Sequence, residues 1–309
     1  MEVDVLLNQF SPHVDENFLD LFYHEIQSFE LDGSNTKINL HTLKIENNIF
    51  VYSELVEKLF DCIVTYCLSR KELEIYKNNK GIYVKAIQRL RKWENNDGEL
   101  GEVLLYCFLE SHLRAPKIFT KMELKTSPND YVKGSDGVHV LQVDKNNFQL
   151  IFGESKLEKT FQRCLYDAFN SINDFITRNT NNIHDEIRLL NTHLEKESIS
   201  PALYNVLKKI IIPSAREEEI FKDNAFGIFA GFEITVDEDS RKLSNSEFRK
   251  MIRAKIKSEV ESQYSYIQKK IDEHKLYGTT FYVYAFPFVE ISNTRKRIIR
   301  NLMEATNDF

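Results

Sequence analysis

The sequence predicts an α/β fold in which helices flank a mixed β-sheet. Stretches with strand composition alternate with stretches whose apolar side chains recur at helical spacing. The 309 residues are 42% hydrophobic and 28% charged, which is typical of a globular protein and excludes a wholly disordered chain. A polar segment at residues 94–98 interrupts the pattern. We therefore expect an N-terminal accessory α/β region over residues 1–94 and a larger domain over residues 95–309.

Three elements are expected in the N-terminal region. Residues 37–45 have strand composition, and residues 52–68 form a helix with Leu55 and Ile63 on one apolar stripe. A second helix is predicted over residues 82–93, with basic side chains on its outer face.

The larger domain is expected to alternate between helices and strands. The predicted helices cover residues 99–113, 157–177, 183–194, 201–212, 244–273 and 291–304. The predicted strands cover residues 117–125, 136–143, 148–156, 226–236 and 279–289. Five of the ten glycines fall between residues 98 and 153. Since glycine permits tight turns and close backbone approach, we expect a functional site in this segment.

Charge and cysteine content limit the class of protein. The net charge of −6 excludes a protein that coats nucleic acid through net charge alone. The first residues carry acids where a secretory signal needs basic residues, and no apolar run is long enough to span a bilayer. We therefore expect a cytoplasmic protein without membrane contact. Four cysteines without a CxxC pair are expected to be buried free thiols, with metal binding as the alternative: Cys62, Cys67, Cys107 and Cys164.

An acid and a lysine stand at the end of one predicted strand. Strand side chains alternate, so Glu154 and Lys156 share a face, and that face also carries Phe148, Leu150 and Phe152. The two charged residues are roughly 6.6 Å apart along the strand, which leaves room for a metal ion and a water between their charged groups. A charge that emerges from an apolar face needs a partner or a metal. The alternative interpretation is a strand-end salt bridge.

A second acid comes from the preceding predicted strand. If residues 144–146 form a three-residue turn, Val143 pairs with Asn147 and Asp136 lies opposite Glu154. A four-residue turn would place Asp136 opposite Ser155. Two carboxylates and the carbonyl of Ser155 suit Mg²⁺ or Mn²⁺, and Lys156 could orient a metal-bound water against a phosphate. The alternative for Asp136 is a turn residue, since Asp-Gly is a common turn pair.

The order of these elements resembles the PD-(D/E)xK nuclease superfamily over roughly residues 98–178. Gly98 to Glu102 is similar to the family's G-x-x-x-E segment, Asp136 matches its metal-binding Asp, and Glu154 to Lys156 matches its ExK. The resemblance implies that Asp136, Glu154 and Lys156 are catalytic. It also implies a mixed restriction-endonuclease-like sheet, with Glu102 and the Ser155 carbonyl as further metal ligands.

Some residues depart from this pattern or allow another interpretation. Ser135 stands where the superfamily often has Pro, and Gln162 and Tyr166 resemble its QxxxY motif but follow the ExK closely. Helix packing or surface exposure is the alternative for these two residues. Glu102 could instead be a first-turn acid favoured by the helix dipole, and Glu99 competes for the same role.

A closer resemblance is to the HamA family of nuclease subunits of Hachiman anti-phage defence systems. It rests on the segments at residues 98–102, 133–137, 152–156 and 229–233, and on the closing strand and helix. It implies a Mg²⁺-dependent deoxyribonuclease that acts on DNA beside a superfamily 2 helicase subunit.

Two other functions remain open from the sequence. One is a catalytically silent PD-(D/E)xK module that binds DNA or a helicase, and the other is a stand-alone restriction-type endonuclease. Three basic segments, at residues 85–92, 249–257 and 295–300, could contact DNA or be solvated faces. The helix after Ser244 and the first 95 residues are candidate surfaces for a partner protein.

Overall fold

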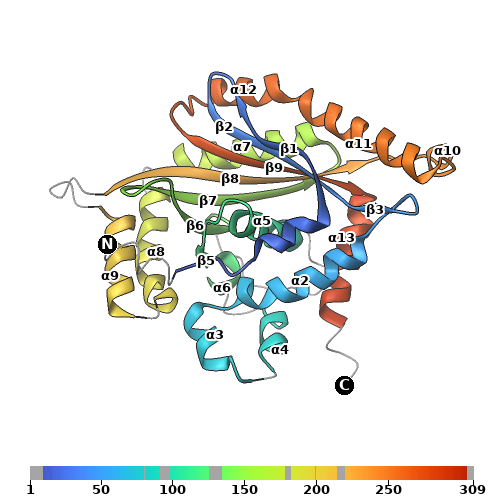
Figure 1. Ribbon diagram of the computed structural model, residues 1–309. Coiled ribbons are helices and arrows are strands. Elements are labelled where there is room, and N and C mark those ends of the chain that lie inside the picture. Colours follow the sequence, from blue (N-terminus) through green and yellow to red (C-terminus); the bar gives the residue numbers. More distant parts are fainter. Residues whose placement is uncertain are drawn as a thin grey trace.

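The protein is a seven-stranded mixed sheet with helices on both faces (Figure 1). The computed structural model describes residues 10–79, 81–90, 98–124, 134–177, 182–198, 200–213 and 220–304. The prediction of an α/β fold with a mixed sheet flanked by helices is confirmed at this level.

Four parallel strands form the middle of the sheet, and antiparallel strands extend it at both edges. In spatial order the strands are β1 (Phe22–Leu31), β2 (Asn35–Leu43), β9 (Thr280–Val289), β8 (Phe221–Ile234), β7 (Asn147–Glu158), β6 (Gly137–Gln142) and β5 (Lys117–Thr120). A separate hairpin consists of β3 (Ile45–Glu46) and β4 (Ile49–Phe50). Strand β9, and β8 from Ala225 onward, are almost wholly buried, as expected for parallel strands covered on both faces.

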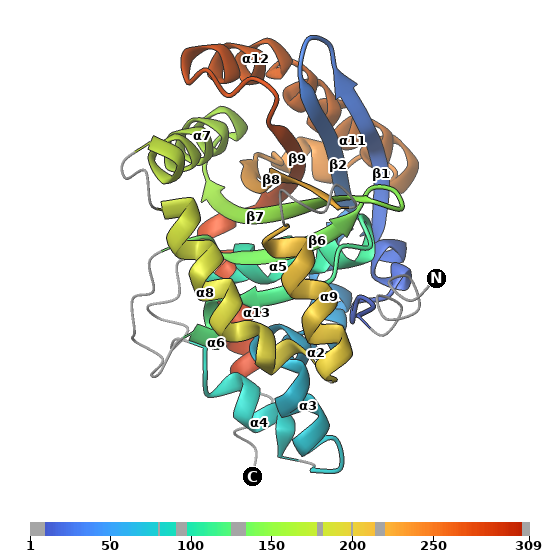
Figure 2. The ribbon, with the colours of Figure 1, turned by 90° about the vertical axis from the view of Figure 1, so that its left-hand side faces the viewer.

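The helices divide between the two faces of the sheet (Figure 1). One face carries α7 (Phe161–Thr177), α11 (Asn245–Glu261) and α12 (Tyr264–Glu273), and the other carries α2 (Tyr52–Cys67), α5 (Glu99–Ser111) and α13 (Ile291–Glu304). Short segments complete this second side: η1 (Glu16–Leu21), α3 (Arg70–Tyr76), α4 (Ile82–Ile87) and α6 (Lys121–Leu124). Figure 2 shows α8 (Asn182–Glu197) and α9 (Pro201–Ile211) side by side at one end of the sheet. The remaining helix of the described residues, α10 (Glu238–Arg241), follows β8.

Aromatic side chains join α5 to the central strands. The ring of Phe108 stacks on those of Tyr284 and Phe229, with centroids 5.3 Å and 6.3 Å apart. All these side chains are fully buried. The packing fixes α5 beneath β7 and β8, and so fixes the position of the acids in its first turn.

Several predicted boundaries are wrong, because strand pairing or local backbone geometry moves the end of an element. The strand expected over residues 117–125 ends at Thr120, where the chain turns into α6. β7 runs on to Glu158 because Leu157 and Glu158 pair with β8, so the next helix begins at Phe161 and not at residue 157. The helix expected over residues 244–273 is two helices, since Gln263 leaves helical geometry and bonds back to Val260.

The N-terminal region contributes more of the sheet than expected. Strand β1 was not predicted, and β2 joins β9 in parallel, with Asn35 paired with Thr280. The boundary proposed near residue 94 falls outside the described residues and stays a prediction.

Two further expectations concern thiols and membranes. All four cysteines are buried and free, as predicted. Among the described helices, none combines the length and the apolar character that crossing a bilayer requires.

Candidate active site

The hairpin of β6 and β7 has the three-residue turn expected from the sequence. The N–H of Val143 donates to the carbonyl of Asn147 at 2.9 Å, and the Asp144 carboxylate accepts the N–H groups of Asn146 and Asn147. Val138 pairs with Phe152, and the predicted register is confirmed from there to Gln142. Just before β6, the Asp136 N–H donates to the carbonyl of Gly153 at 2.9 Å, so Asp136 lies beside residues 153–155 of β7.

Asp136 lies just before β6 and is fixed to the middle residue of the Glu154–Lys156 segment. Its Oδ2 accepts hydrogen bonds from the backbone N–H and the hydroxyl of Ser155, each at 2.8 Å. The N–H and C=O of one strand residue point toward the same neighbour. The Ser155 carbonyl therefore faces the same open edge of β7, beyond the beginning of β6.

Glu154 and Lys156 lie on the α7 face of β7. Phe152, on this face, packs against Phe175 of α7, and the Ser171 hydroxyl of the same helix bonds to Glu154. The Lys156 Nζ is 2.6 Å from the Glu154 Oε1. The predicted space for a metal and a water between these groups is therefore closed in this structure, because the two side chains meet in an ion pair.

Burial and neighbouring charges shift the pKa values of this pair. Desolvation raises the pKa of Glu154, and the Asp136 carboxylate raises it further, while Lys156 and Ser171 oppose the shift. Burial alone would lower the pKa of Lys156, but Glu154, Asp136 and Asp167 outweigh it and raise that pKa above its usual value. The Lys156 side chain is therefore protonated at neutral pH.

A second ammonium group, not expected from the sequence, stands on the α5 side. The Lys121 Nζ is 3.4 Å from the Asp136 Oδ1 and 3.9 Å from the Glu102 Oε1. The Tyr66 hydroxyl of α2 donates to the Glu102 Oε2 at 3.0 Å. Burial opposes the charged form of Lys121, yet Asp136 and Glu102 raise its pKa above the usual value. Glu99, the alternative to Glu102 as a ligand from α5, is only 3% exposed, whereas the Glu102 side chain is 11% exposed.

The structure thus brings every predicted site residue to one edge of β7. We call Glu102, Lys121, Asp136, Glu154 and Lys156 the edge cluster; these side chains are between 11% and 26% exposed. Their oxygens are the hard donors that Mg²⁺ prefers. As placed, however, ammonium groups accompany the carboxylates. Within the described residues, no three His, Cys, Asp or Glu side chains form a group that could hold a metal ion.

Asp136, Glu154 and Lys156 thus lie around one end of β7. A family model named HamA matches residues 16–302. The chain belongs to the HamA family. This membership suggests a component of Hachiman anti-phage defence. Among curated proteins, no sequence matches the chain.

Glycines let the first helix of the site approach its strand in this HamA family member. A Cβ on Gly101 of α5 would lie 3.2 Å from the Ser155 Cβ and 3.3 Å from its hydroxyl. A Cβ on Gly153 would lie 3.1 Å from Leu105 of the same helix. These contacts explain part of the glycine clustering and hold Glu102 beside Ser155.

Gln162 and Tyr166 are exposed on α7. The Tyr166 ring lies beneath the Lys270 Nζ of α12, at 4.8 Å, and near the Arg163 guanidinium, at 5.0 Å. For Tyr166 this arrangement agrees with the helix-packing alternative.

Lys121 is the site residue that sequence reasoning missed. Its backbone N–H donates to the carbonyl of Asp136 at 3.0 Å, and Thr120 pairs with Gly137. The pairing of β5 with β6 therefore brings it to the site. A correct register for that pair would have revealed it, but the sequence offers no tight turn between these strands to set one.

Proposed function

We propose that this protein is a metal-dependent deoxyribonuclease and the effector subunit of a Hachiman anti-phage defence complex. The single observation that carries the proposal is the meeting of Asp136, Glu154 and Lys156 at one strand end. Membership of the HamA family supports the defence role. The open strand edge and the partly exposed carboxylates support chemistry at this place.

Asp136 and Glu154 would hold Mg²⁺ or Mn²⁺, with the Ser155 carbonyl and Glu102 as further oxygen ligands. Bound there, the ion would supply Lewis acidity toward a phosphodiester. Lys156 keeps its proton, because its pKa is raised, and offers positive charge to a phosphate oxygen. Lys121 offsets part of the negative charge of Glu102 and Asp136.

The decisive experiment is cleavage of plasmid and linear duplex DNA, by the chain alone and with its helicase partner. We expect cleavage with Mg²⁺ or Mn²⁺ and none with EDTA; Ca²⁺ should bind without turnover, since it is larger and a weaker Lewis acid. Asp136→Asn, which keeps the size of the side chain, is the matched inactive variant. Full activity in EDTA, or in Asp136→Asn, would contradict the proposal.

One observation favours a second candidate, a silent module that binds DNA or a helicase. The carboxylates of the edge cluster already have ammonium partners, and Glu154 forms a direct ion pair with Lys156. A silent module would bind its partner normally in Asp136→Asn and would cleave no DNA under any metal condition.

The helicase partnership rests on the family and on charge. A chain of net charge −6 with carboxylates in its site repels a polyanion, so local basic side chains must offset that repulsion. We expect weak DNA binding by the isolated chain and tight binding in a mixture with the helicase subunit. Nanomolar duplex binding by the lone chain at physiological salt, unchanged by the helicase, would contradict the partnership.

A further inference from the structure

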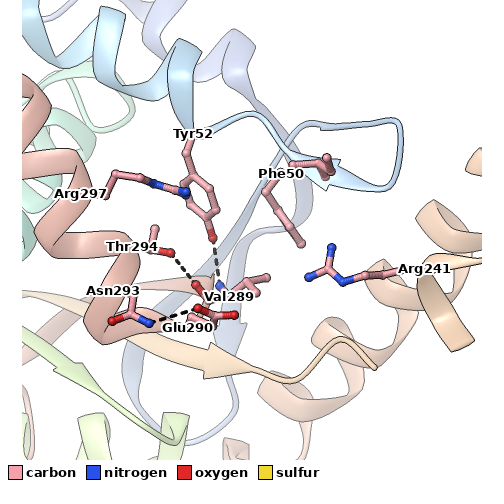
Figure 3. A pocket seen from close by; sticks show the side chains of 9 residues that line it. Phe50, Tyr52, Arg241, Val289, Glu290, Asn293, Thr294 and Arg297 are labelled. Atoms are coloured by element: carbon pink, nitrogen blue, oxygen red, sulfur yellow. Dashed lines mark hydrogen bonds between the residues drawn. The ribbon is translucent and has the colours of Figure 1, made fainter. Parts of the chain in front are cut away.

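A pocket lies at the end of β9, apart from the edge cluster (Figure 3). Its volume is about 270 Å³, and five segments line it: β4, the beginning of α2, α10, the end of β9 with the residue after it, and the first turns of α13. This volume is below the usual range for drug-sized ligands, about 300–1,000 Å³. The pocket therefore suits a small group and not a large cofactor.

Two guanidinium groups enter the pocket from opposite sides. Figure 3 shows Arg241 of α10 and Arg297 of α13 with their side chains turned toward the same space. Among the described residues, neither forms an ion pair. The Arg297 guanidinium lies 5.9 Å from the centre of the Tyr52 ring. Two unpaired arginines that converge on one small space are a typical arrangement for a phosphate group.

Tyr52 adds a hydroxyl to the same wall. Its oxygen accepts the N–H of Val289 at 3.0 Å. That bond leaves the hydroxyl hydrogen able to donate to a ligand. Burial raises the pKa of Tyr52 to about 12, so the hydrogen stays in place at neutral pH. Phe50 supplies an apolar wall beside these donors, as a sugar ring would require.

One carboxylate also lines the pocket. Glu290 accepts a hydrogen bond from the Asn293 amide at 3.2 Å. Two arginines and one glutamate leave a net charge of +1 (2 − 1), so the pocket still attracts an anion.

The frame of the pocket is fixed by contacts between distant parts of the chain. The Asn48 amide donates to the carbonyls of Arg241 and Leu243, at 3.0 Å and 2.7 Å, and joins the β3–β4 hairpin to α10. The Thr294 hydroxyl donates to the carbonyl of Val289 at 2.6 Å. The backbones that present the two arginines are therefore held in place before any ligand arrives.

Several other basic side chains in the described part of the chain are already paired. Arg253 is bound to the Glu25 carboxylate through two nitrogens, and Lys85 and Arg89 both contact Glu72. Arg300 pairs with Glu304. Arg241 and Arg297 differ from this group, which favours them as anion ligands.

The pocket and the edge cluster lie near the same end of the parallel strands. Lys156 pairs with Ala230, and Ala230 pairs with Ala285, four residues before Val289. On a flat sheet this separates Lys156 from Val289 by roughly 13 Å along the strands and two strand spacings, about 10 Å, across them. The resulting distance, roughly 16 Å, equals about five base-pair steps of 3.4 Å along a duplex.

We propose that the pocket between Arg241 and Arg297 binds one backbone phosphate of the DNA strand, some base pairs from the phosphate at the edge cluster. This inference rests on the proposed function for its ligand. The two arginines would give the acidic protein a local binding site for DNA, and this site would hold a DNA strand across the end of the β-sheet. Phosphate contacts of this kind set position and carry no sequence preference.

The test measures binding without cleavage. The full chain, in EDTA, is titrated with a short labelled duplex oligonucleotide over a series of salt concentrations. We expect Arg241→Gln/Arg297→Gln to weaken binding by about tenfold or more, since charge-assisted hydrogen bonds are lost. The slope of log K against log salt should fall in magnitude by about 0.9, which corresponds to one phosphate contact on a duplex.

The matched control is Lys242→Gln/Lys296→Gln. It removes the same formal charge from exposed neighbours of the two arginines, and neither lysine lines the pocket. We expect a much smaller effect. Equal losses in both double variants, or no loss in the arginine variant, would overturn the proposal. Circular dichroism checks that all variants fold.

A second measurement separates this proposal from the proposed function. Inorganic phosphate should raise the Tm of the wild type more than that of Arg241→Gln/Arg297→Gln, compared at equal ionic strength. A selective response to phosphate together with loss of oligonucleotide binding supports the pocket even if no condition gives cleavage.

A response to phosphate or a mononucleotide without any change in oligonucleotide binding would assign the pocket to a free phosphate compound and overturn the DNA assignment. Metal-dependent cleavage with unaltered binding in the arginine variant would refute the pocket alone.

Discussion

Helix α5 carries two carboxylates two turns apart, in contrasting surroundings. Glu102 belongs to the edge cluster, where its partners are the Tyr66 hydroxyl and the Lys121 ammonium. Glu110 accepts three backbone N–H groups, from His13, Val14 and Lys117, at 2.6, 2.9 and 3.0 Å. A side-chain partner can move aside for a ligand, whereas a backbone N–H cannot.

Glu110 is part of a second group of charges, which we call the buried charge cluster. Its members are Arg70, Glu110, Lys117, Glu123 and Glu197, none more than 8% exposed. Lys117 bonds to the Glu123 carboxylate and to the carbonyl of Leu68. The comparison shows how similar residue types serve two purposes. The buried charges fasten η1, α3 and α8 to the sheet, and the edge cluster keeps oxygens within reach of solvent.

The largest expected difference between the buried charge cluster and the edge cluster is in how much a lost lysine lowers the free energy of unfolding. Lys117→Met removes a fully buried ammonium and leaves Glu123 without its partner, so we expect a loss of about 3–5 kcal/mol in the free energy of unfolding. Lys121→Met in the edge cluster should cost at most about 1 kcal/mol. Urea denaturation of the two variants measures both values. Equal losses would mean that the two clusters do not differ in this way.

Substitutions in the edge cluster should instead affect DNA cleavage much more than stability. Glu154→Gln and Lys156→Ala should each reduce DNA cleavage by about 100-fold or more, because they remove a metal ligand or a charge at the phosphate. Their unfolding free energies should stay within about 1 kcal/mol of the wild type, since both side chains are partly exposed. Lys159→Ala, an exposed change just beyond β7, is the control for cleavage. Wild-type cleavage in both site variants would refute their catalytic role.

The buried charge cluster should also make stability depend on pH. Desolvation, and then the nearby Glu123, raise the pKa of Glu197 to about 8. Because the folded protein holds this proton more tightly than the unfolded chain, stability is highest below the unfolded pKa, about 4.5, and falls as pH rises through about 8. Glu197→Gln should remove this part of the decline and gain about 1–3 kcal/mol at pH 9 over the wild type. Parallel stability curves for the two proteins between pH 5 and pH 9 would contradict this assignment.

A smaller effect concerns the approach of α5 to β7. In Gly101→Ala the new Cβ would meet Ser155 at 3.2 Å. The clash costs about 1–3 kcal/mol, and the better helix propensity of alanine returns up to about 1 kcal/mol. We expect a net loss of about 1 kcal/mol and reduced cleavage, measured by denaturation and by the plasmid assay. An equally stable and active variant would show that the close approach does not matter.

The sequence predicted those parts of the site that depend on local pairing. The turn at residues 144–146 sets the register, and the register brings Asp136 beside the segment from Gly153 to Ser155. Lys121 escaped prediction because the pairing of β5 with β6 is not set by a short turn. The partnership of Tyr66 with Glu102 depends on how α2 packs beside α5, which no spacing in the sequence encodes.

The same limit applies to the fold. Residue periodicity located β8, β9 and α13, because the apolar side chains of each recur at the spacing of its own secondary structure. It did not reveal the parallel pairing of β2 with β9, or the contact of Asn48 with Arg241, because these unite residues far apart in the chain. The pocket between Arg241 and Arg297 depends on such contacts, so it could be found only in the structure.

The pairing of β2 with β9 has a consequence for how the protein is made. Strand β2 is synthesised long before β9, and it has no neighbour on one side until residues 280–289 have followed. Pairing across so long a stretch of chain is slow, because the loop must close before its contacts form. During synthesis the sheet therefore stays incomplete until residues 280–289 have been made. Strand β9 then joins β2 to β8 and leads directly into α13, which carries Arg297. The two parts of the sheet are thus held together by a strand that is made after both of them.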